Sequence, residues 1–325
     1  MRLGVSTPVV VKVPGHTAAW EDTAGIAEIT RVAEHADRLG FHFLTCSEHV
    51  AMPRGVYSPQ LPQGRGTRYW DPLATLSWLA ARTENIRLLT NVLVLGYHHP
   101  LAIAKRYGTL DRMSGGRVVL GLGVGTAEEE FRTLGAEFAG RGARADDAIR
   151  ALRATLSRTE PEYHGEFYDF AGLVVDPCAI QARVPLWVGG HSRRALRRAV
   201  TLGDGWIPGA PDAETLRTML AAHPERPTGF EVVSGLGGGL DPLADPDRAE
   251  EALHAMAAAG VTMVPFRPAH RSLEHYLEQL EAVAALEVFE PLSRHPGDRD
   301  HRTRSVEPLP RLSRTSSDTS GENSS

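Results

Sequence analysis

The chain has 325 residues, 42% of them hydrophobic and 23% charged, which is the composition of a folded protein with a large core. Its formal net charge of -5 at pH 7 argues against a general nucleic-acid binder, because phosphate binding requires a basic face. Two cysteines, Cys46 and Cys178, cannot form a disulfide framework, and no Cys and His spacing matches a zinc site. The sequence has no signal-peptide pattern and no apolar stretch of about 18 residues. We therefore expect a cytoplasmic protein with a small-molecule substrate and with neither nucleic acid nor membrane as a partner.

Eight short apolar runs alternate with helical segments as far as about residue 286. The runs predicted to be buried parallel strands are 3–5, 41–46, 86–95, 118–124, 186–188, 205–207, 230–233 and 261–265. Apolar residues at helical spacing between 26 and 39 predict the first helix, and Gly40 ends it. Asp71 before Pro72 is typical of an N-cap followed by proline at the first helical position. Further helices are predicted at 101–113, 144–157, 193–202, 213–222, 247–259 and 273–286.

Strands that alternate with helices in this way predict a (β/α)8 barrel, although a doubly wound open sheet has a similar pattern. Two connections are too long for simple loops: residues 47–70 after the second strand, and residues 158–184 in the connection after the fourth. We assign residues 1–288 to the barrel and 289–325 to a disordered tail. From Pro291 onward the tail has hardly any apolar residue that could repay its ordering entropy.

The second predicted strand ends at an acid beside an imidazole, Glu48 and His49. In a parallel barrel, functional side chains lie at the carboxyl ends of the strands and in the loops after them. An imidazole exchanges protons near neutral pH, and a neighbouring carboxylate can orient it. The alternative is an exposed polar pair at the start of a loop. We take both residues as candidate catalytic residues.

The fourth predicted strand leads into GLGVGTAEEEF, residues 121–131. A dinucleotide fingerprint would need a third glycine where Thr126 stands, so a Rossmann site is a weak interpretation. The glycines still indicate a close approach to the backbone, either by a ligand or by a neighbouring strand. Thr126 is expected to cap the acidic helix that follows.

The fifth predicted strand leads into WVGGHSRRALRRA, residues 187–199. Gly189 and Gly190 are expected to leave backbone amides accessible, and Ser192 is expected to be an N-cap. The amides at the start of a helix, with the positive end of its dipole, form an anion site. The arginines that would add positive charge are Arg193, Arg194, Arg197 and Arg198. The alternative is a glycine turn before a solvated arginine face.

The residues present argue against several other chemistries. Arg194 stands where the nucleophile elbow of a hydrolase needs its last glycine. No H-x-H follows the first strand, and His98 and His99 before Pro100 are expected to be loop or capping residues. We therefore expect no metal site.

Several segments in order resemble the luciferase-like monooxygenase superfamily, the barrels that use a flavin or a deazaflavin. They are SEHV (47–50), YWDPL (69–73), NVLVLGYHHPLAIAKRYGTLDRMSGGRVVLGLGVG (91–125), WVGG (187–190) and GDGW (203–206). The resemblance covers residues 1–285, and the joint order and spacing of the segments make it specific. The segments are most similar to the branch that uses coenzyme F420, a deazaflavin.

This resemblance implies roles for residues at the strand ends. In similar proteins a non-prolyl cis peptide stands behind the coenzyme ring, and Asn91-Val92 is the match here. Glu48 and His49 would face the reactive side of the ring, and the residues after the fifth strand would receive a phosphate. The residues implied to bind the coenzyme are Asn91, Val92, Gly123, Gly125, Thr126, Gly189, Gly190, His191 and Ser192.

The resemblance implies an F420-dependent oxidoreductase that transfers a hydride between C5 of the deazaflavin and a small-molecule substrate. An arginine-rich helix would also suit the oligoglutamate tail of that coenzyme. The first alternative is an FMN-dependent monooxygenase that uses reduced flavin and O2. The second is a barrel that has lost its coenzyme and serves as a binding protein.

The resemblance also carries expectations about the substrate pocket and the assembly. Residues 51–69 and 162–176 are expected to shape the pocket, with Tyr57, Tyr69 and Trp70 as candidate stacking surfaces. Members of the family are frequently dimers, so we expect a homodimer.

Overall fold

A closed barrel of parallel strands forms the centre of the computed structural model, which describes residues 1–12, 17–52 and 68–293. The strands follow one another around the barrel in the order β1-β10-β9-β8-β7-β4-β3-β2. They are β1 (Arg2–Val5), β2 (Phe43–Cys46), β3 (Arg87–Val94), β4 (Val118–Gly123), β7 (Leu186–Gly189), β8 (Gly205–Gly209), β9 (Glu231–Ser234) and β10 (Met263–Phe266). Because the sheet closes, the predicted (β/α)8 barrel is confirmed and the open doubly wound sheet is excluded.

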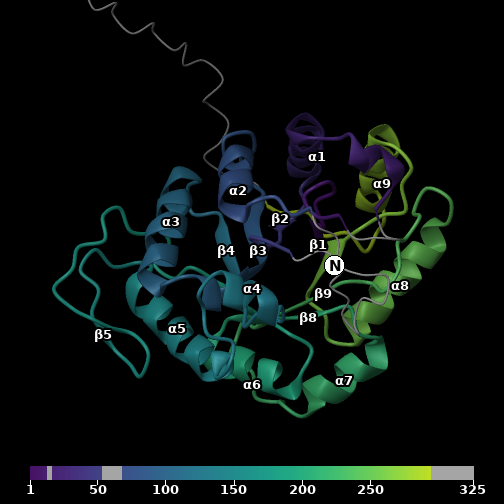
Figure 1. Cartoon of the computed structure of the whole chain (residues 1–325). Helices are drawn as coiled ribbons and strands as arrows, with labels where there is room; N and C mark the ends of the chain where they lie inside the picture. The colour runs from purple at the N-terminus through teal and green to yellow at the C-terminus, as the bar shows by residue number, and fades with distance from the viewer. Residues whose placement is uncertain (13–16, 53–67, 294–325) are drawn as a thin grey trace, which may run out of the picture. The chain divides into compact units, whose positions relative to one another are not determined.

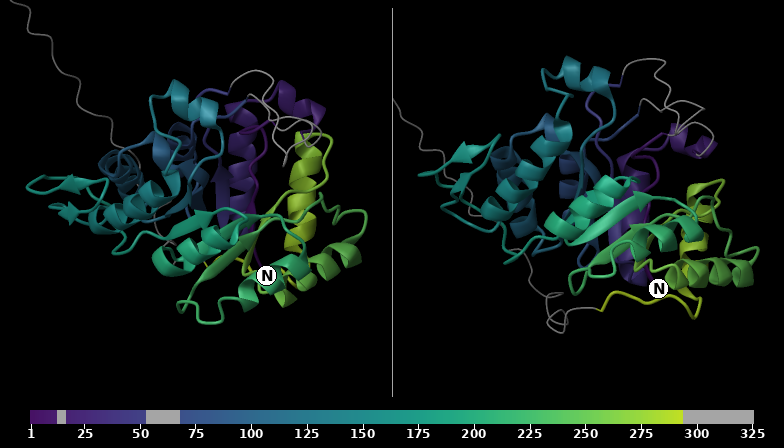
Figure 2. Two further views of the ribbon diagram at one scale, coloured as in Figure 1. Left: turned by 60° about the horizontal axis from the view of Figure 1, so that its bottom comes forward. Right: turned by 90° about the horizontal axis from the view of Figure 1, so that it is seen from below.

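Helices surround the barrel, and most of them pack on its outer face (Figure 1). They are α1 (Ile26–Leu39), α2 (Pro72–Ala80), α3 (Pro100–Met113), α4 (Glu128–Thr133), α5 (Arg141–Thr155), α6 (Arg193–Leu202), α7 (Ala213–Ala221), α8 (Pro246–Ala258) and α9 (Leu273–Ala284). Short 3-10 helices occur at η1 (Ala19–Asp22) and η2 (Leu95–Tyr97). Figure 2 turns the lower side forward and shows the green helices α6 to α8 beside the green strands.

The helix ends follow the sequence signals with one exception. The Asp71 carboxylate accepts a hydrogen bond from the Ala74 backbone N–H at 2.7 Å and caps α2, as predicted. Gly40, at φ 85°, ends α1 in the left-handed conformation that glycine adopts without a steric cost. The predicted cap at Thr126 is wrong, because α4 begins at Glu128 and its N-cap position is Ala127.

The interior of the barrel is filled by side chains, one from each of the strands after β1. They are Phe43, Leu89, Val119, Trp187, Ile207, Val233 and Met263. On β1 a Cβ at Gly4 would lie 2.2 Å from the Phe43 ring, so the ring takes the space that a β1 side chain would fill. The barrel is therefore a packed core with no pore, and a ligand must bind at its mouth.

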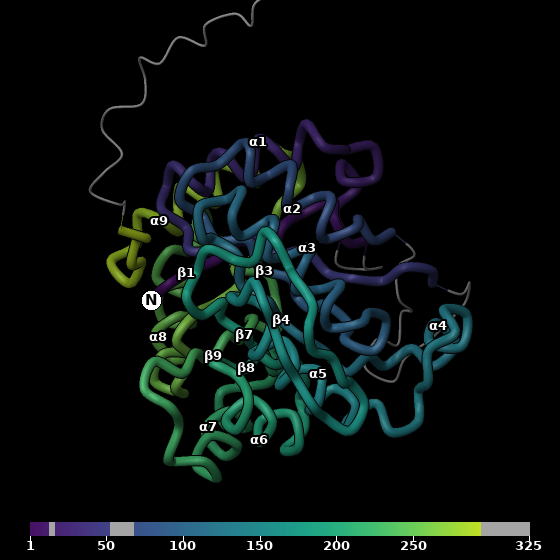
Figure 3. Tube along the Cα trace, turned by 90° about the vertical axis from the view of Figure 1, so that its left-hand side faces the viewer, coloured from purple at the N-terminus to yellow at the C-terminus, as the bar shows by residue number. Residues whose placement is uncertain are grey.

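The mouth lies at the end of the barrel away from the N-terminus. Because the strands are parallel, all their carboxyl ends meet at one end. Figure 3 shows the barrel from the side, with Met1 at one end and α4 at the other.

The two long connections predicted from the sequence are present. After β2 the chain runs through residues 47–70, of which 53–67 lie outside the described residues. Residues 158–184 carry a short hairpin of β5 (Tyr163–His164) and β6 (Asp169–Phe170), which lies at the side of the barrel near α5 in Figure 1. The Asp147 carboxylate on α5 accepts hydrogen bonds from the backbone N–H groups of Phe167 and Tyr168 at 2.8 and 3.1 Å. The hairpin is thereby tied to the outer face of the barrel.

The chain contacts the barrel beyond the expected boundary at residue 288. The Phe289 ring lies 5.3 Å from that of Phe41, and the Leu292 backbone N–H donates to the Gly40 carbonyl at 2.7 Å. The compact unit runs from Met1 to Ser293. The rest of the predicted tail, 294–325, lies outside the described residues. Among the described helices, none is long and apolar enough to cross a membrane.

Candidate active site

A cavity of about 610 Å³ opens at the mouth of the barrel. Small-molecule and cofactor sites typically measure about 300–1,000 Å³. The loops after β2, β3, β4 and β7 all contribute to its wall. Its lining includes every site residue predicted from the sequence: Glu48, His49, Asn91, Val92, Gly123, Gly125, Thr126, Gly189, Gly190, His191 and Ser192.

His49 is held by a carboxylate from another part of the chain. Its Nδ1 atom lies 2.6 Å from Oε2 of Glu130, on the first turn of α4. The other oxygen of Glu130 accepts hydrogen bonds from the backbone N–H groups of Val50 and Ala51 at 2.6 and 3.1 Å. Tyr97 donates its hydroxyl to Oε2 at 2.8 Å. These contacts fix the imidazole ring and leave Nε2 as the nitrogen that Glu130 does not use.

Glu130 is ionised despite complete burial of its side chain. Burial by itself raises the pKa of this carboxyl group. Hydrogen bonds from His49 and Tyr97, the charge on His49 and the backbone N–H of Ala51 outweigh burial and lower the pKa of Glu130 overall. A buried carboxylate with this many donors can orient an imidazole and stabilise its charged form.

Glu48 has partners different from the one expected. Its Oε1 atom lies 2.6 Å from Nε2 of His98, and its Oε2 atom accepts the Val94 backbone N–H at 2.6 Å. The prediction that Glu48 assists His49 is therefore corrected, because Glu130 is the carboxylate hydrogen-bonded to His49. Neighbouring side chains of an extended segment point to opposite sides, so adjacent residues in the sequence reach different partners.

The floor of the cavity is formed around Val92. The Asn91-Val92 peptide bond is cis, as the resemblance implied, and the Asn91 carbonyl accepts the Ser47 hydroxyl at 2.7 Å. A Cβ at Gly123 would lie 2.5 Å from Val92 Cγ2, and one at Gly189 would lie 2.8 Å from Val92 Cγ1. Gly123 and Gly189 therefore make room for the Val92 side chain, and both line the cavity. For the strand-four glycine Gly123, close packing against a neighbouring strand is confirmed, and contact with a ligand stays a prediction.

The start of α6 forms one end of the cavity. Ser192 caps this helix as predicted and accepts the Ala195 backbone N–H at 3.2 Å. The Gly190 N–H donates to the Ile207 carbonyl at 3.0 Å, so the expected accessible amide at Gly190 is wrong. The first backbone N–H groups of a helix have no hydrogen-bond partner within the helix. The N–H groups suited to bind an anion here are therefore those that follow Gly190, from His191 onward.

Among the described residues that line the cavity, two are arginines, and one of them was missed from the sequence. Arg198 on α6 pairs with Asp146 and donates to the Gly142 carbonyl at 3.0 Å. Arg141, the first residue of α5, donates to the Gly125 carbonyl at 3.1 Å. No sequence motif marks Arg141, because its bond to the loop after β4 joins residues 16 positions apart. The remaining predicted arginines are exposed on α6: Arg193, Arg194 and Arg197.

Only some of the residues predicted to face the substrate line the cavity. Tyr69 lines the cavity, and its ring centroid lies 4.5 Å from that of His49. Trp70 packs against the hydrophobic core, and Tyr57 lies outside the described residues. Among the described residues that line the cavity, none comes from 162–176. That segment was expected to shape the pocket, but its hairpin is tied to the side of the barrel.

Known proteins resemble this chain over most of its length. Residues 1–305 match the family model of the luciferase-like monooxygenases. One uncharacterised protein of Mycobacterium tuberculosis is 33% identical over 197 residues, which cover 58% of this chain and 68% of the relative. A second uncharacterised protein of the same organism is 30% identical over 266 residues, which cover 78% of this chain and 91% of the relative. F420-dependent glucose-6-phosphate dehydrogenase of Nocardia farcinica is 29% identical over 191 residues, covering 56% of this chain and 53% of the relative.

Solved structures share the fold at lower identity. Monooxygenase RslO1 from Streptomyces bottropensis has a TM-score of 0.68 at 21% identity, covering 88% of this chain and 98% of that one. Coenzyme F420-dependent tetrahydromethanopterin reductase from Methanopyrus kandleri has a TM-score of 0.65 at 15% identity, covering 81% and 95%. The oxygenating constituent of 3,6-diketocamphane monooxygenase from Pseudomonas putida, in complex with FMN, has a TM-score of 0.65 at 16% identity, covering 88% and 97%. Proteins that use F420 and proteins that use FMN therefore share this barrel.

Proposed function

Because the chain belongs to the luciferase-like monooxygenase family, we propose that it is an F420-dependent oxidoreductase acting on a small-molecule substrate. One observation carries the proposal. A single cavity has the His49–Glu130 pair on one wall and the start of α6 on another. The first can exchange a proton, and the second can hold a phosphate.

The residues of the cavity fit a flavin-like coenzyme. Gly123 and Gly189 leave the floor beside Val92 without side chains of their own. The amides that begin α6 suit a phosphate, and Arg141 and Arg198 add positive charge nearby. The bound coenzyme would supply hydride transfer at C5, and the protein supplies placement and proton handling.

His49 is the proton-handling group in this proposal. Its Nδ1–H donates to the Glu130 carboxylate, so its Nε2 accepts a proton from a substrate hydroxyl or, once protonated, donates it back. The hydrogen bond to Glu130 holds the ring in this orientation. Tyr69 lies against the same ring and offers a stacking surface to a substrate.

Two features favour F420 over FMN. The Nocardia farcinica relative is an F420-dependent dehydrogenase, and it is 29% identical over 191 residues. Arg193, Arg194 and Arg197 are exposed on the helix that begins at the cavity, where they suit an acidic oligoglutamate tail. An FMN-dependent monooxygenase is the second candidate, because the barrel matches monooxygenases as well.

The proposal is tested by turnover without oxygen. Protein loaded with oxidised F420 is offered a panel of alcohols, and protein loaded with reduced F420 is offered unsaturated ketones, while the absorbance of the coenzyme is followed. We expect a substrate-dependent change that is the same in air and under argon. Turnover only with reduced FMN and oxygen would contradict the proposal and support the monooxygenase. The homodimer stays a prediction, which analytical ultracentrifugation would test.

A further inference from the structure

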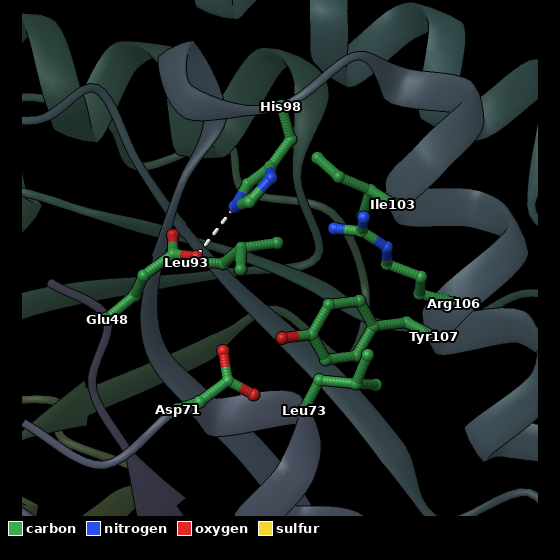
Figure 4. A pocket seen from close by; sticks show the side chains of 8 residues that line it. All are labelled: Glu48, Asp71, Leu73, Leu93, His98, Ile103, Arg106 and Tyr107. Atoms are coloured by element: carbon green, nitrogen blue, oxygen red, sulfur yellow. Dashed lines mark hydrogen bonds and ion pairs between the residues drawn. The ribbon is translucent and has the colours of Figure 1, made fainter. Parts of the chain in front are cut away.

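A second, smaller cavity lies behind Glu48. Its volume is about 40 Å³, and a cavity needs only about 10–15 Å³ to hold a water molecule. It lies between the end of β3 and the helices α2 and α3, as Figure 4 shows. The residues that line it are Glu48, Asp71, Leu73, Leu93, His98, Ile103, Arg106 and Tyr107.

Glu48 lines both the small cavity and the large one at the mouth of the barrel. Its side chain is only 5% exposed, and Oε1 is bonded to Nε2 of His98 at 2.6 Å. On the far side of the small cavity, Asp71 and Arg106 are exposed to solvent. Polar groups therefore continue from the large cavity, through Glu48 and His98, to the protein surface.

The small cavity offers enough polar groups to hold water. In Figure 4 the Tyr107 hydroxyl and the Asp71 carboxylate point toward one another, and the Glu48–His98 bond closes the opposite side. Burial, with the nearby carboxylates of Glu48 and Asp71, raises the pKa of Tyr107. Its hydroxyl therefore keeps its hydrogen and can both donate to and accept from a water molecule.

The polar groups that run from the large cavity through Glu48 and His98 to the surface can supply a proton that the reduced coenzyme needs. When an alcohol is oxidised, its hydride brings two electrons and one negative charge to the coenzyme, and its hydroxyl proton goes to His49. The proton that balances the charge on the coenzyme then comes from Glu48, which solvent refills, while His49 returns the substrate proton to solvent. A separate supply from solvent lets the charge on the coenzyme be balanced without drawing on His49.

We propose that Glu48 and His98 form a proton relay between the large cavity and solvent. The proton of the Glu48–His98 pair leaves from the Glu48 carboxyl group toward the large cavity. His98 then takes a replacement from water in the small cavity, which exchanges with solvent near Asp71 and Arg106. The relay rests on the proposed function, because it serves a coenzyme that accepts hydride or electrons.

Infrared difference spectroscopy on the coenzyme-loaded protein tests the relay without a known substrate. Bound F420, or FMN if only that binds, is photoreduced with a sacrificial electron donor in the buffer that supplies the electrons. We expect a transient band of the Glu48 carboxyl group that Glu48→Gln removes. In His98→Gln, which keeps an N–H donor for Glu48 but cannot take up a proton, recovery of that band should be at least 10-fold slower.

The neighbouring histidine provides a matched control. His99 caps α3 and accepts the Leu101 N–H at 3.2 Å, and it lines neither cavity among the described residues. His99→Gln should recover like the wild type, whereas Tyr107→Phe should recover more slowly. If Glu48→Gln does not fold, the His98→Gln and Tyr107→Phe recoveries decide the question.

The outcomes separate the relay from the proposed function. If the protein binds neither coenzyme in a fluorescence titration, the proposed function fails and the relay fails with it, because the relay serves a bound coenzyme. If the coenzyme binds but no band depends on Glu48, or recovery in His98→Gln equals that of the wild type, the relay is overturned. In that case Glu48 only holds the Val94 backbone, and the effect of Glu48→Gln should be confined to coenzyme affinity.

Discussion

The Nδ1 atom of His49 lies 2.6 Å from Oε2 of Glu130, which joins the loop after β2 to the first turn of α4. This bond fixes the orientation of the His49 imidazole at the mouth of the barrel through a carboxylate 81 positions away in the sequence. It also fixes which nitrogen of the ring is bonded to Glu130.

Removing the imidazole tests its role in proton transfer. His49→Ala should lower kcat by roughly 100-fold or more, because general acid–base catalysis contributes about that factor. Coenzyme affinity should change little, since the phosphate end of the cavity is untouched. His164→Ala, on the exposed hairpin, is the control and should leave kcat unchanged. Near-normal turnover in His49→Ala would remove this residue from the mechanism.

Replacing the carboxylate tests whether Glu130 acts through His49. Glu130→Gln should lower kcat by roughly 10-fold or more and leave KM nearly unchanged, because the amide keeps the size of the side chain but loses the charged hydrogen bond that holds the His49 ring. A purely structural role would raise KM together with the fall in kcat. Glu129→Gln, one residue earlier and exposed, should match the wild type in both kcat and KM.

The sequence predicted the barrel well because its signals are local. Buried strands, helical spacing and caps such as Asp71 depend on neighbours in the chain, and these were found where expected. Glu48 and His49 could be named because strand ends meet at the mouth of any parallel barrel, and the resemblance to the luciferase-like family implied the other nine predicted cavity residues. The hydrogen-bond partners of these residues could not be predicted, because they depend on how loops from separate parts of the chain approach one another.

Glu130 shows why part of the site was hidden. It is the third acid in a row at 128–130, a pattern typical of a solvated helix face. Only because α4 begins at Glu128 does position 130 turn inward beside Phe131, where both are buried. Which side of α4 Glu130 faces depends on the residue at which the helix begins. That residue is set by tertiary packing, so the sequence pattern did not reveal it.

Blocking the start of α6 tests the phosphate site. Gly190 has φ 129°, and a Cβ there would lie 2.8 Å from Ala195 Cβ, so Gly190→Val must shift this turn. We expect coenzyme affinity to fall by at least 10-fold in fluorescence titrations. Gly172→Val is the matched control, since Gly172 also has a positive φ but lies outside the cavity. If Gly190→Val leaves the coenzyme affinity unchanged, the phosphate does not bind at the start of α6.

The buried carboxylate of Glu21 predicts a pH dependence of stability. Its oxygens accept the Val9 N–H at 2.7 Å and contact His270 Nε2 at 3.0 Å. Burial raises the pKa of Glu21, but hydrogen bonds from His270, Val9 and Ala18 outweigh burial and lower it below the ordinary 4.5. Its stabilising contribution is therefore present above about pH 4.5 and is lost as the pH falls toward the lowered pKa.

Urea unfolding at pH 7 and below pH 4 measures this contribution. Glu21→Gln should lower the free energy of unfolding at pH 7 by about 2 kcal/mol, and its loss of stability on acidification should be smaller than that of the wild type. The exposed Glu287→Gln should behave as the wild type does. An equal acid dependence in Glu21→Gln would show that other carboxylates account for it.

Binding of the coenzyme tests the central claim most directly. The purified protein is titrated separately with oxidised F420 and with FMN, and quenching of coenzyme fluorescence gives the two Kd values. We predict tight binding of F420 and weak or no binding of FMN. Tight binding of FMN alone, or of neither coenzyme at high concentration, would contradict the proposal that this barrel is an F420-dependent oxidoreductase.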